Sequence, residues 1–313
     1  MAHHHHEYHS DRQRTRNIAM AFFLNVSFCI IELVGGLLTN SIAIMSDALH
    51  DFGDSVALGL AWIFQRIAGR KPTAQYTYGY KRFSLLSAII NSMILLAGSM
   101  FVLYESVQRI LSPAETNAQG MLLLAIFGIA ANGAAILRLK KGKSVNERVV
   151  SLHLMEDVLG WIAVLVVSIV MLFIHMPVLD PLLSVGISVY ILYNVYRNLK
   201  IIFHVILQGS PANVDEKRIA EKLQSLPGVT DIHDLHIWTM DSEYHVLTVH
   251  LVLNKPQSIA AQQQIRATAH LLLKEMNIQH STIEIEYANE RCEWCEEQAP
   301  TPCSTPHLSP PRH

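Results

Sequence analysis

The chain has 313 residues, of which 50% are hydrophobic and 16% are charged, and its formal net charge is −2. So high an apolar share excludes an ordinary soluble protein, and the near-neutral charge gives no indication of a nucleic-acid partner. We therefore expect a membrane protein with a soluble part. Residues 1–14 form a polar, His-rich tail without the apolar segment that is typical of a signal peptide.

Six apolar stretches follow, each about 20 residues long, which is the length that crosses a bilayer as a helix. They predict an α-helical membrane domain over residues 15–209. Its six transmembrane helices are expected at 18–38, 42–64, 85–110, 121–139, 149–174 and 178–202.

Most Lys and Arg residues of this region lie in or beside alternate connectors between these stretches. Lys and Arg occur in the amino-terminal tail, at 65–82, at 140–148 and after the sixth stretch, whereas the other three connectors have none. Positively charged connectors stay on the cytoplasmic side of a membrane. We therefore expect both termini to be cytoplasmic.

The composition changes near residue 210. A predicted helix at 214–226 precedes two alternating apolar segments at 229–240 and 243–254, which a turn joins as a hairpin. A second helix at 259–276 and a third strand at 281–287 follow. The order α-β-β-α-β predicts a small, ferredoxin-like α+β domain over residues 210–288, with its helices on one face of the sheet. Residues 289–313, with Cys and several Pro, are expected to be a flexible tail.

Two of the predicted spans carry ionisable residues at the same spacing. His50 and Asp54 in the second span, and His153 and Asp157 in the fifth, are four residues apart, so each pair shares one helix face. Charged groups at membrane depth usually face a cavity, a partner or an ion. Two imidazoles and two carboxylates supply four ligands for a tetrahedral divalent metal, zinc above all. Hydrogen bonds that merely hold helices together are the alternative, which two such pairs fit poorly.

The same ligands predict coupling to protons. Two carboxylates neutralise a doubly charged ion, which reduces the desolvation penalty. An imidazole must be neutral to bind metal, and histidine has a reference pKa of about 6.5, near cytoplasmic pH. Protons and metal therefore compete for one site, which predicts metal export in exchange for protons.

Other polar residues of the predicted spans leave alternatives open. Asp47 lies one turn before Asp51 and three residues before His50, so one of these two aspartates can serve as a ligand instead. Glu32 and Asn25 in the first span are expected to be packing or water-cavity groups. Asp180, which precedes a proline, is expected to cap the sixth span or to help release metal on the outer side.

These features together resemble the cation diffusion facilitator family. The resemblance rests on the two His-x-x-x-Asp pairs, the six spans, the terminal α+β domain and the segments SIAIMSDALH (41–50) and HDLHIW (233–238). It implies a homodimer with its cytoplasmic domains in contact, and alternating access with proton exchange. The Tyr78-Gly79-Tyr80 motif of the family sets the register, so that His50 and Asp54 are the ligands and Asp51 is a neighbouring or gating carboxylate. Two His and two Asp resemble the ligands of zinc-preferring members.

The chain departs from some of these relatives in two connectors. Relatives with a metal site between the second and third spans use Asp and His, where this chain has Thr73, Tyr76 and Tyr80, so we expect no metal there. The connector at 140–148 lacks the long His-rich insertion typical of eukaryotic relatives. This favours a protein of the bacterial inner membrane.

The resemblance also implies a metal site in the cytoplasmic domain. His233 and His250 match positions that bind zinc in relatives, and Glu286 ends the last predicted strand nearby. His236 is expected on the opposite strand face, because its separation from His233 is odd. Strand-surface side chains that bind no metal are the alternative. Weaker candidate ligands are His280 and Glu284.

A Cys-x-x-Cys pair, Cys292 and Cys295, is a further candidate for this cytoplasmic site. Two thiolates at this spacing are a familiar half of a zinc site, and a reducing cytosol disfavours a disulfide between them. The other half can come from the neighbours of His233 and His250, or from the amino-terminal histidines of either protomer. The bound Zn²⁺ would be a structural or regulatory ion.

The sequence thus predicts a secondary active transporter and not an enzyme. The predicted transporter is a homodimer that exports zinc across a lipid bilayer. Two other functions stay open. A proton-coupled carrier of another substrate can use the His/Asp pairs purely as a relay. A membrane-bound metal sensor can use the cytoplasmic His and Cys residues without transport.

Overall fold

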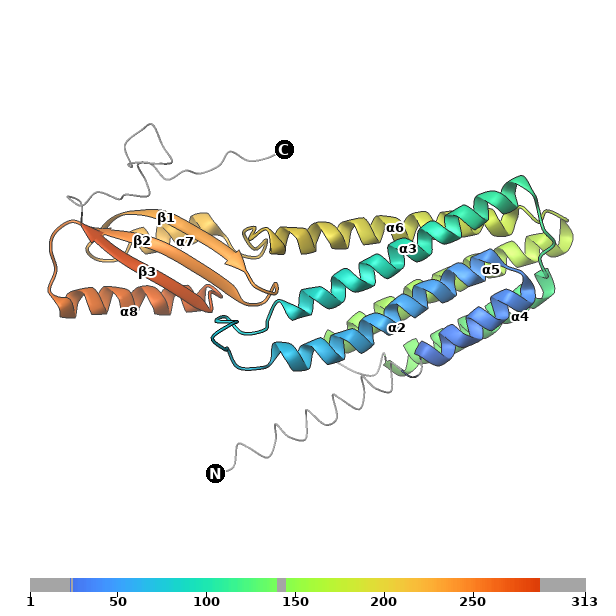
Figure 1. Ribbon diagram of the computed structural model, residues 1–313, viewed down its shortest axis with the longest axis horizontal. Helices are drawn as coiled ribbons and strands as arrows, with labels where there is room; N and C mark the ends of the chain where they lie inside the picture. The colour runs from blue at the N-terminus through green and yellow to red at the C-terminus, as the bar shows by residue number, and fades with distance from the viewer. Residues whose placement is uncertain (1–22, 24, 140–144, 288–313) are drawn as a thin grey trace, which may run out of the picture. The chain divides into compact units, whose positions relative to one another are not determined.

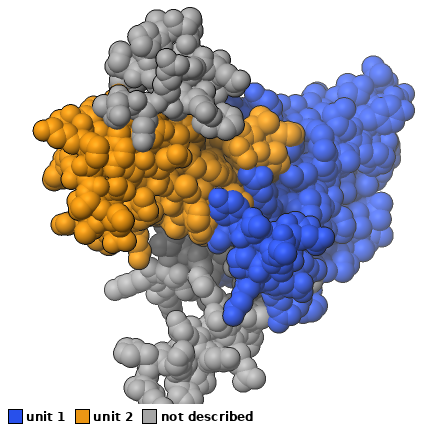
Figure 2. Space-filling view, turned by 60° about the vertical axis from the view of Figure 1, so that its left-hand side comes forward, with its two compact units in different colours: residues 1–200 blue, residues 201–313 orange. Residues whose placement is uncertain are grey.

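The computed structural model describes residue 23 and residues 25–139 and 145–287; at residues 61, 65, 138, 139 and 145–153 it describes the backbone alone. The chain divides into two compact units, residues 1–200 and 201–313, which Figure 2 colours separately. The amino-terminal histidines, Cys292 and Cys295 lie outside the described residues, as does the side chain of His153.

The first unit is built from long helices, one on each of the six predicted spans. Four of them, α3 to α6, are long and apolar enough to cross a membrane. The α2 helix is as long but carries three aspartates, and the first helix is shorter over its described residues. In chain order, the helices are Asn25–Thr39, α2 (Ile42–Ala68), α3 (Phe83–Leu111), α4 (Ala118–Leu139), α5 (Val145–Phe173) and α6 (Leu179–Ile206) (Figure 1).

These helices pack in sequence-adjacent pairs. The α2 helix lies against α3, α4 lies against α5, and α2 also contacts α5. A buried apolar cluster that includes Ile44, Met121 and Trp161 lies where α2, α4 and α5 meet. The two helices predicted to carry the His/Asp pairs are therefore neighbours.

The second unit confirms the predicted α-β-β-α-β order. Its elements are α7 (Glu216–Gln224), β1 (Val229–Thr239), β2 (His245–Leu253), α8 (Ile259–Glu275) and β3 (His280–Tyr287). The β2 strand is central, because it pairs antiparallel with β1 and parallel with β3 (Figure 1). Both helices begin at side-chain caps: Asp215 accepts from the backbone N–H of Arg218, and Ser258 accepts from that of Ala261.

The core of this unit lies on one face of the sheet. Leu247, Val249 and Leu251 of β2 share a buried cluster with residues of both α7 and α8, among them Ile219 and Leu273. Because strand side chains alternate between faces, His250 points to the opposite face. The sheet therefore has an apolar side under the helices and a polar side that carries histidines.

Candidate metal centres

The first candidate centre lies on α2, where His50 and Asp54 share a helix face. The His50 Nε2 and Asp54 Oδ2 atoms are 3.7 Å apart, and both side chains are about three-quarters buried, with 26% and 21% exposed. A small cavity beside His50 is also lined by Ser46 of α2 and Ser99 of α3. The pair is thus held in a mostly dry environment with hydroxyl groups at hand.

Contact between α2 and α5 brings further carboxylates toward this pair. Asp51 of α2 is only 4% exposed and interacts electrostatically with Asp54 and with Asp157 of α5. Asp47 also lies close to α5 at Gly160: its Oδ1 atom would be 3.7 Å from the Cβ of an alanine placed there. Several carboxylates therefore gather at one seam between two helices. Acidic groups gathered in a low-dielectric region can ionise together only beside a positive charge, so the cluster favours a bound cation.

His153 falls on α5 one helical turn before Asp157, as the sequence predicts. The backbone alone is described at this position, so the fourth predicted ligand stays a prediction. Asp157 itself is half-buried on the described part of α5. The helix phase places His153 and Asp157 on one face of α5.

The polar residues of the first helix contact α2. The Asn25 side-chain amide donates to the Asp51 backbone carbonyl at 3.2 Å and to the Ser55 hydroxyl at 3.1 Å. Glu32, which is 2% exposed, makes a side-chain hydrogen bond with Asp51. Asn25 therefore packs the first helix onto α2, while Glu32 extends the buried acidic group around Asp51.

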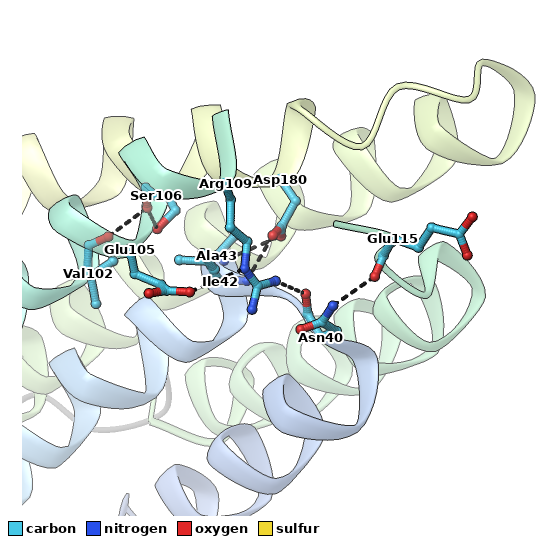
Figure 3. Close-up of polar contacts among 10 residues, drawn as sticks. Asn40, Ile42, Ala43, Val102, Glu105, Ser106, Arg109, Glu115 and Asp180 are labelled. Carbon is cyan, nitrogen blue, oxygen red and sulfur yellow. Dashed lines mark hydrogen bonds and ion pairs between the residues drawn. The ribbon is translucent and has the colours of Figure 1, made fainter. Parts of the chain in front are cut away.

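The carboxylate of Asp180 lies at the amino-terminal end of α2 (Figure 3). It accepts from the Ser41 hydroxyl at 2.5 Å, from the Ile42 N–H at 2.8 Å and from the Ala43 N–H at 3.3 Å. The sequence predicts a cap for the sixth span itself, whereas the carboxylate instead caps α2. The reason is tertiary: the start of α6 lies beside the first turn of α2, whose backbone N–H groups lack partners within the helix.

A second set of contacts ties α3 to the same end (Figure 3). The Arg109 guanidinium donates to the Asn40 carbonyl at 2.6 Å and lies 3.6 Å from the Glu105 carboxylate. The Ser106 hydroxyl of α3 donates to the Ser184 hydroxyl of α6 at 3.1 Å. The helix that carries His50 and Asp54 is therefore anchored at its start by polar contacts with its neighbours.

The second candidate centre lies on the polar face of the sheet, where β1, β2 and β3 each contribute one residue. His233 pairs directly with His250 across β1 and β2, with the ring centroids 5.2 Å apart. The Glu286 carboxylate on β3 reaches both rings, at 3.0 Å from His233 Nε2 and 2.7 Å from His250 Nδ1. One ligand atom from each of these three residues lies within 4.8 Å of the others.

The donor set at this centre fits a cation. Neither His233 Nε2 nor His250 Nδ1 makes a hydrogen bond within the described part of the chain, although both are buried and face the Glu286 oxygens. Imidazole lone pairs and carboxylate oxygens repel each other unless a positive charge lies between them. Two nitrogens and one carboxylate are suitable donors for a divalent transition metal.

The structure corrects the prediction for His236, because β1 has a bulge between His233 and His236. His233 pairs with His250 and His236 pairs with Thr248, so three steps on β1 match two steps on β2. The extra residue reverses the alternation, and His236 therefore lies on the same face as His233. A regular-strand argument from sequence spacing fails at such a bulge.

The weaker candidates of the sheet lie at different distances from the centre. Glu284 pairs with His250, and its carboxylate is 3.5 Å from His250 Nε2. His280 pairs with Val246, six residues before Glu286 and at the other end of β3. Sequence reasoning missed Asp234, whose carboxylate lies 3.5 Å from the same nitrogen of His250.

The fold defines a helical membrane protein with an appended α/β domain, and comparison with known proteins identifies its class. The family model of the cation efflux transmembrane domain matches residues 18–207, and that of the cation efflux protein cytoplasmic domain matches residues 211–288. The chain therefore belongs to the cation efflux family, the cation diffusion facilitators, whose members are transporters and not enzymes.

Curated relatives resemble the chain over nearly its whole length. A cadmium, cobalt and zinc/H⁺-K⁺ antiporter of Bacillus velezensis is 34% identical, over 92% of this chain and 93% of its own. Zinc transporter ZitB of Pectobacterium atrosepticum is 33% identical, over 94% and 91%. Metal cation efflux system protein CzcD of Cupriavidus metallidurans is 33% identical, over 91% and 90%. The solved metal-bound C-terminal domain of a CzcD transporter is 32% identical and covers 23% of this chain and 99% of its own, with a TM-score of 0.21.

Proposed function

We propose that this protein exports zinc from the cytoplasm in exchange for protons, through a site formed by His50, Asp54, His153 and Asp157. The observation that carries the proposal is the contact between α2 and α5, with Asp51 and Asp157 in electrostatic contact across it. Two imidazoles and two carboxylates match the preferred ligands and charge of Zn²⁺. Relatives named for zinc, cadmium and cobalt transport support the substrate class.

Alternating access supplies the transport cycle in this proposal. Metal binds neutral imidazoles from the cytoplasmic side, and protons that reach the site from the outside displace it. The carboxylates keep the loaded site close to electrical neutrality. This lowers the desolvation cost of holding the metal ion inside the membrane domain.

A second metal site on the sheet complements the first. His233, His250 and Glu286 would hold one Zn²⁺ there as a structural or regulatory ion, with Cys292 and Cys295 as further donors. His233 and His250 are cross-strand neighbours, and His233 Nε2 and His250 Nδ1 make no hydrogen bond within the described residues, which supports this assignment. The match to the family's cytoplasmic domain supports a homodimer, and the bacterial relatives support an inner-membrane location. The basic connectors of the sequence favour placing both termini in the cytoplasm.

Zinc flux and proton flux into proteoliposomes test the transport site. Zinc-dependent proton movement should be abolished in each of three variants, His50→Ala, Asp54→Asn and His153→Ala. Each purified variant should keep the parent's elution profile in size-exclusion chromatography. The matched control is His175→Ala, an exposed histidine after α5, which should transport normally. Normal zinc flux in His50→Ala and His153→Ala would refute the site.

The same assay separates the two other functions. A carrier that uses the pairs as a proton relay would move protons without any dependence on zinc. A metal sensor with an inactive membrane part would bind zinc in its cytoplasmic domain and show no flux of either ion.

A further inference from the structure

The β1 bulge gives Asp234 an unusual backbone conformation. Its φ is +50°, which is in the left-handed region that Asp and Asn tolerate better than most residues. Asp234 is the residue after His233, and the register shift of β1 falls between His233 and His236. The bulge therefore turns the Asp234 carboxylate toward the histidines of the polar face.

The two oxygens of this carboxylate reach two different histidines. Asp234 Oδ1 is 2.8 Å from His236 Nε2, and Asp234 Oδ2 is 3.5 Å from His250 Nε2. His250 presents its other nitrogen, Nδ1, to Glu286 at 2.7 Å. The His250 ring thus has one edge in the candidate metal centre and the other edge toward Asp234.

We propose that Asp234 is a positioning residue for the cytoplasmic metal site: its carboxylate accepts a hydrogen bond from His250 Nε2–H, which keeps the proton on Nε2 and leaves Nδ1 free to bind a divalent metal ion. The inference rests on the proposed cytoplasmic site. A histidine that binds metal through one nitrogen generally donates its other N–H to a carboxylate or carbonyl, which fixes the tautomer and strengthens the ligand. Bound metal makes the Nε2 proton more acidic, so the 3.5 Å contact is expected to shorten on loading.

Two features favour Asp234 over Glu284, whose carboxylate is also 3.5 Å from His250 Nε2. The Glu284 side chain is 64% exposed, whereas that of Asp234 is 32% exposed, so water screens Glu284 more strongly. Asp234 is also held by His236 through its other oxygen, which limits its rotamers. A simple surface pair of Asp234 and His236 would not require the second oxygen to face His250.

Co²⁺ binding to the full-length protein in detergent tests the inference. Co²⁺ gives an absorption spectrum that reports ligand geometry, and the cytoplasmic site is read as the difference between the parent protein and His250→Ala. Asp234→Gly keeps a residue that accepts positive φ and removes the carboxylate, so it should bind Co²⁺ about 10–100-fold more weakly at this site. Its Co²⁺ spectrum should differ from that of the parent protein. Its thermal midpoint without metal should equal that of the parent.

Glu243→Gln is the matched control, because it removes one negative charge from an exposed residue of the β1–β2 hairpin. It should leave both affinity and spectrum unchanged. If Asp234→Gly does not fold, Asp234→Asn carries the test: Asn tolerates the same backbone and offers only one acceptor oxygen, so its affinity should lie between those of the parent and a protein without the carboxylate.

The outcomes distinguish the proposed cytoplasmic metal site from the positioning role of Asp234. If His250→Ala keeps the full Co²⁺ signal, the proposed cytoplasmic site is wrong. If His250→Ala loses that signal but Asp234→Gly, or Asp234→Asn in its place, matches the parent in affinity and spectrum, the site stands and the positioning role of Asp234 is wrong.

Discussion

The Asp180 carboxylate accepts a hydrogen bond from the Ser41 hydroxyl at 2.5 Å, across 139 positions of the chain. Together with its bonds to the Ile42 and Ala43 N–H groups, this contact fixes the first turn of α2 to the start of α6. Asp180 is fully buried, so its removal leaves donors without partners. We expect Asp180→Ala to lower the free energy of unfolding by about 2–4 kcal/mol.

Thermal unfolding in detergent and zinc flux together check this prediction. Both should fall in Asp180→Ala, because α2 also carries His50 and Asp54. Glu115→Gln is the control: its exposed side chain belongs to the same region, but it is the Glu115 backbone carbonyl that accepts a hydrogen bond from Asn40 (Figure 3). An Asp180→Ala protein as stable as the parent would contradict the capping role.

Gly128 of α4 lies against the indole ring of Trp161 on α5. Three indole atoms would be less than 3.0 Å from the Cβ of an alanine there, and the rigid ring cannot rotate within the buried cluster. Gly128→Ala should therefore destabilise the α4–α5 pair by about 1–3 kcal/mol, measured as a lower thermal midpoint. Gly133→Ala on the same helix meets no atom of the described residues within 4 Å and should be neutral or up to about 1 kcal/mol stabilising. Equal effects at the two glycines would rule out the packing explanation.

His245 makes the second unit sensitive to acid. Burial lowers the pKa of His245 below its ordinary value of 6.5, with Asp241 opposing the shift. The folded state therefore binds fewer protons than the unfolded chain as the pH falls below about 6.5, and stability decreases until the pH passes the folded pKa. Well above pH 6.5 the histidine is neutral in both states and contributes no pH dependence.

Amide hydrogen exchange of the full-length protein between pH 5 and 8, corrected for intrinsic rates, measures this effect. His245→Gln should reduce the acid-induced loss of protection in β1, β2 and β3. His270→Gln, at an exposed position of α8, should leave it in place. The assignment to His245 fails if both variants keep the parent's pH profile.

Zinc should stabilise the second unit through His233, His250 and Glu286. A ligand that binds only the folded state adds about 2.7 kcal/mol at 100 times its dissociation constant. The thermal midpoint of the full-length protein should therefore rise with added Zn²⁺ and return on chelation. Replacing His233 and His250 by Ala should remove most of this rise, whereas His270→Ala should preserve it. A rise of the same size in the double variant would place the stabilising ion elsewhere.

Much of the fold could be predicted from the sequence, because local patterns reflect local physics. Apolar runs of bilayer length mark the helices, and alternating apolar positions after residue 228 mark the strands. The hairpin joining β1 and β2 and the caps at Asp215 and Ser258 depend on residues close in sequence. Where the boundaries fall on described residues, the predicted ones accordingly lie within a few residues of those observed.

The candidate sites were predicted less completely. His50 and Asp54 share a helix face whatever surrounds them, and His233, His250 and Glu286 could be grouped by resemblance to the family. The side of His236 could not be predicted, because a bulge reverses the alternation of β1. The partner of Asp180 lies 139 positions away, and no local pattern identifies such a contact.

The sequence by itself determined the class of protein, the spacing of the His/Asp pairs and the order of the elements, because these follow from hydrophobic periodicity and helix geometry. Only the tertiary structure decided which carboxylates meet between α2 and α5, which helix Asp180 caps and which edge of His250 faces Asp234. Those outcomes depend on how elements distant in sequence pack, and that packing is fixed by the whole set of contacts and not by any one segment.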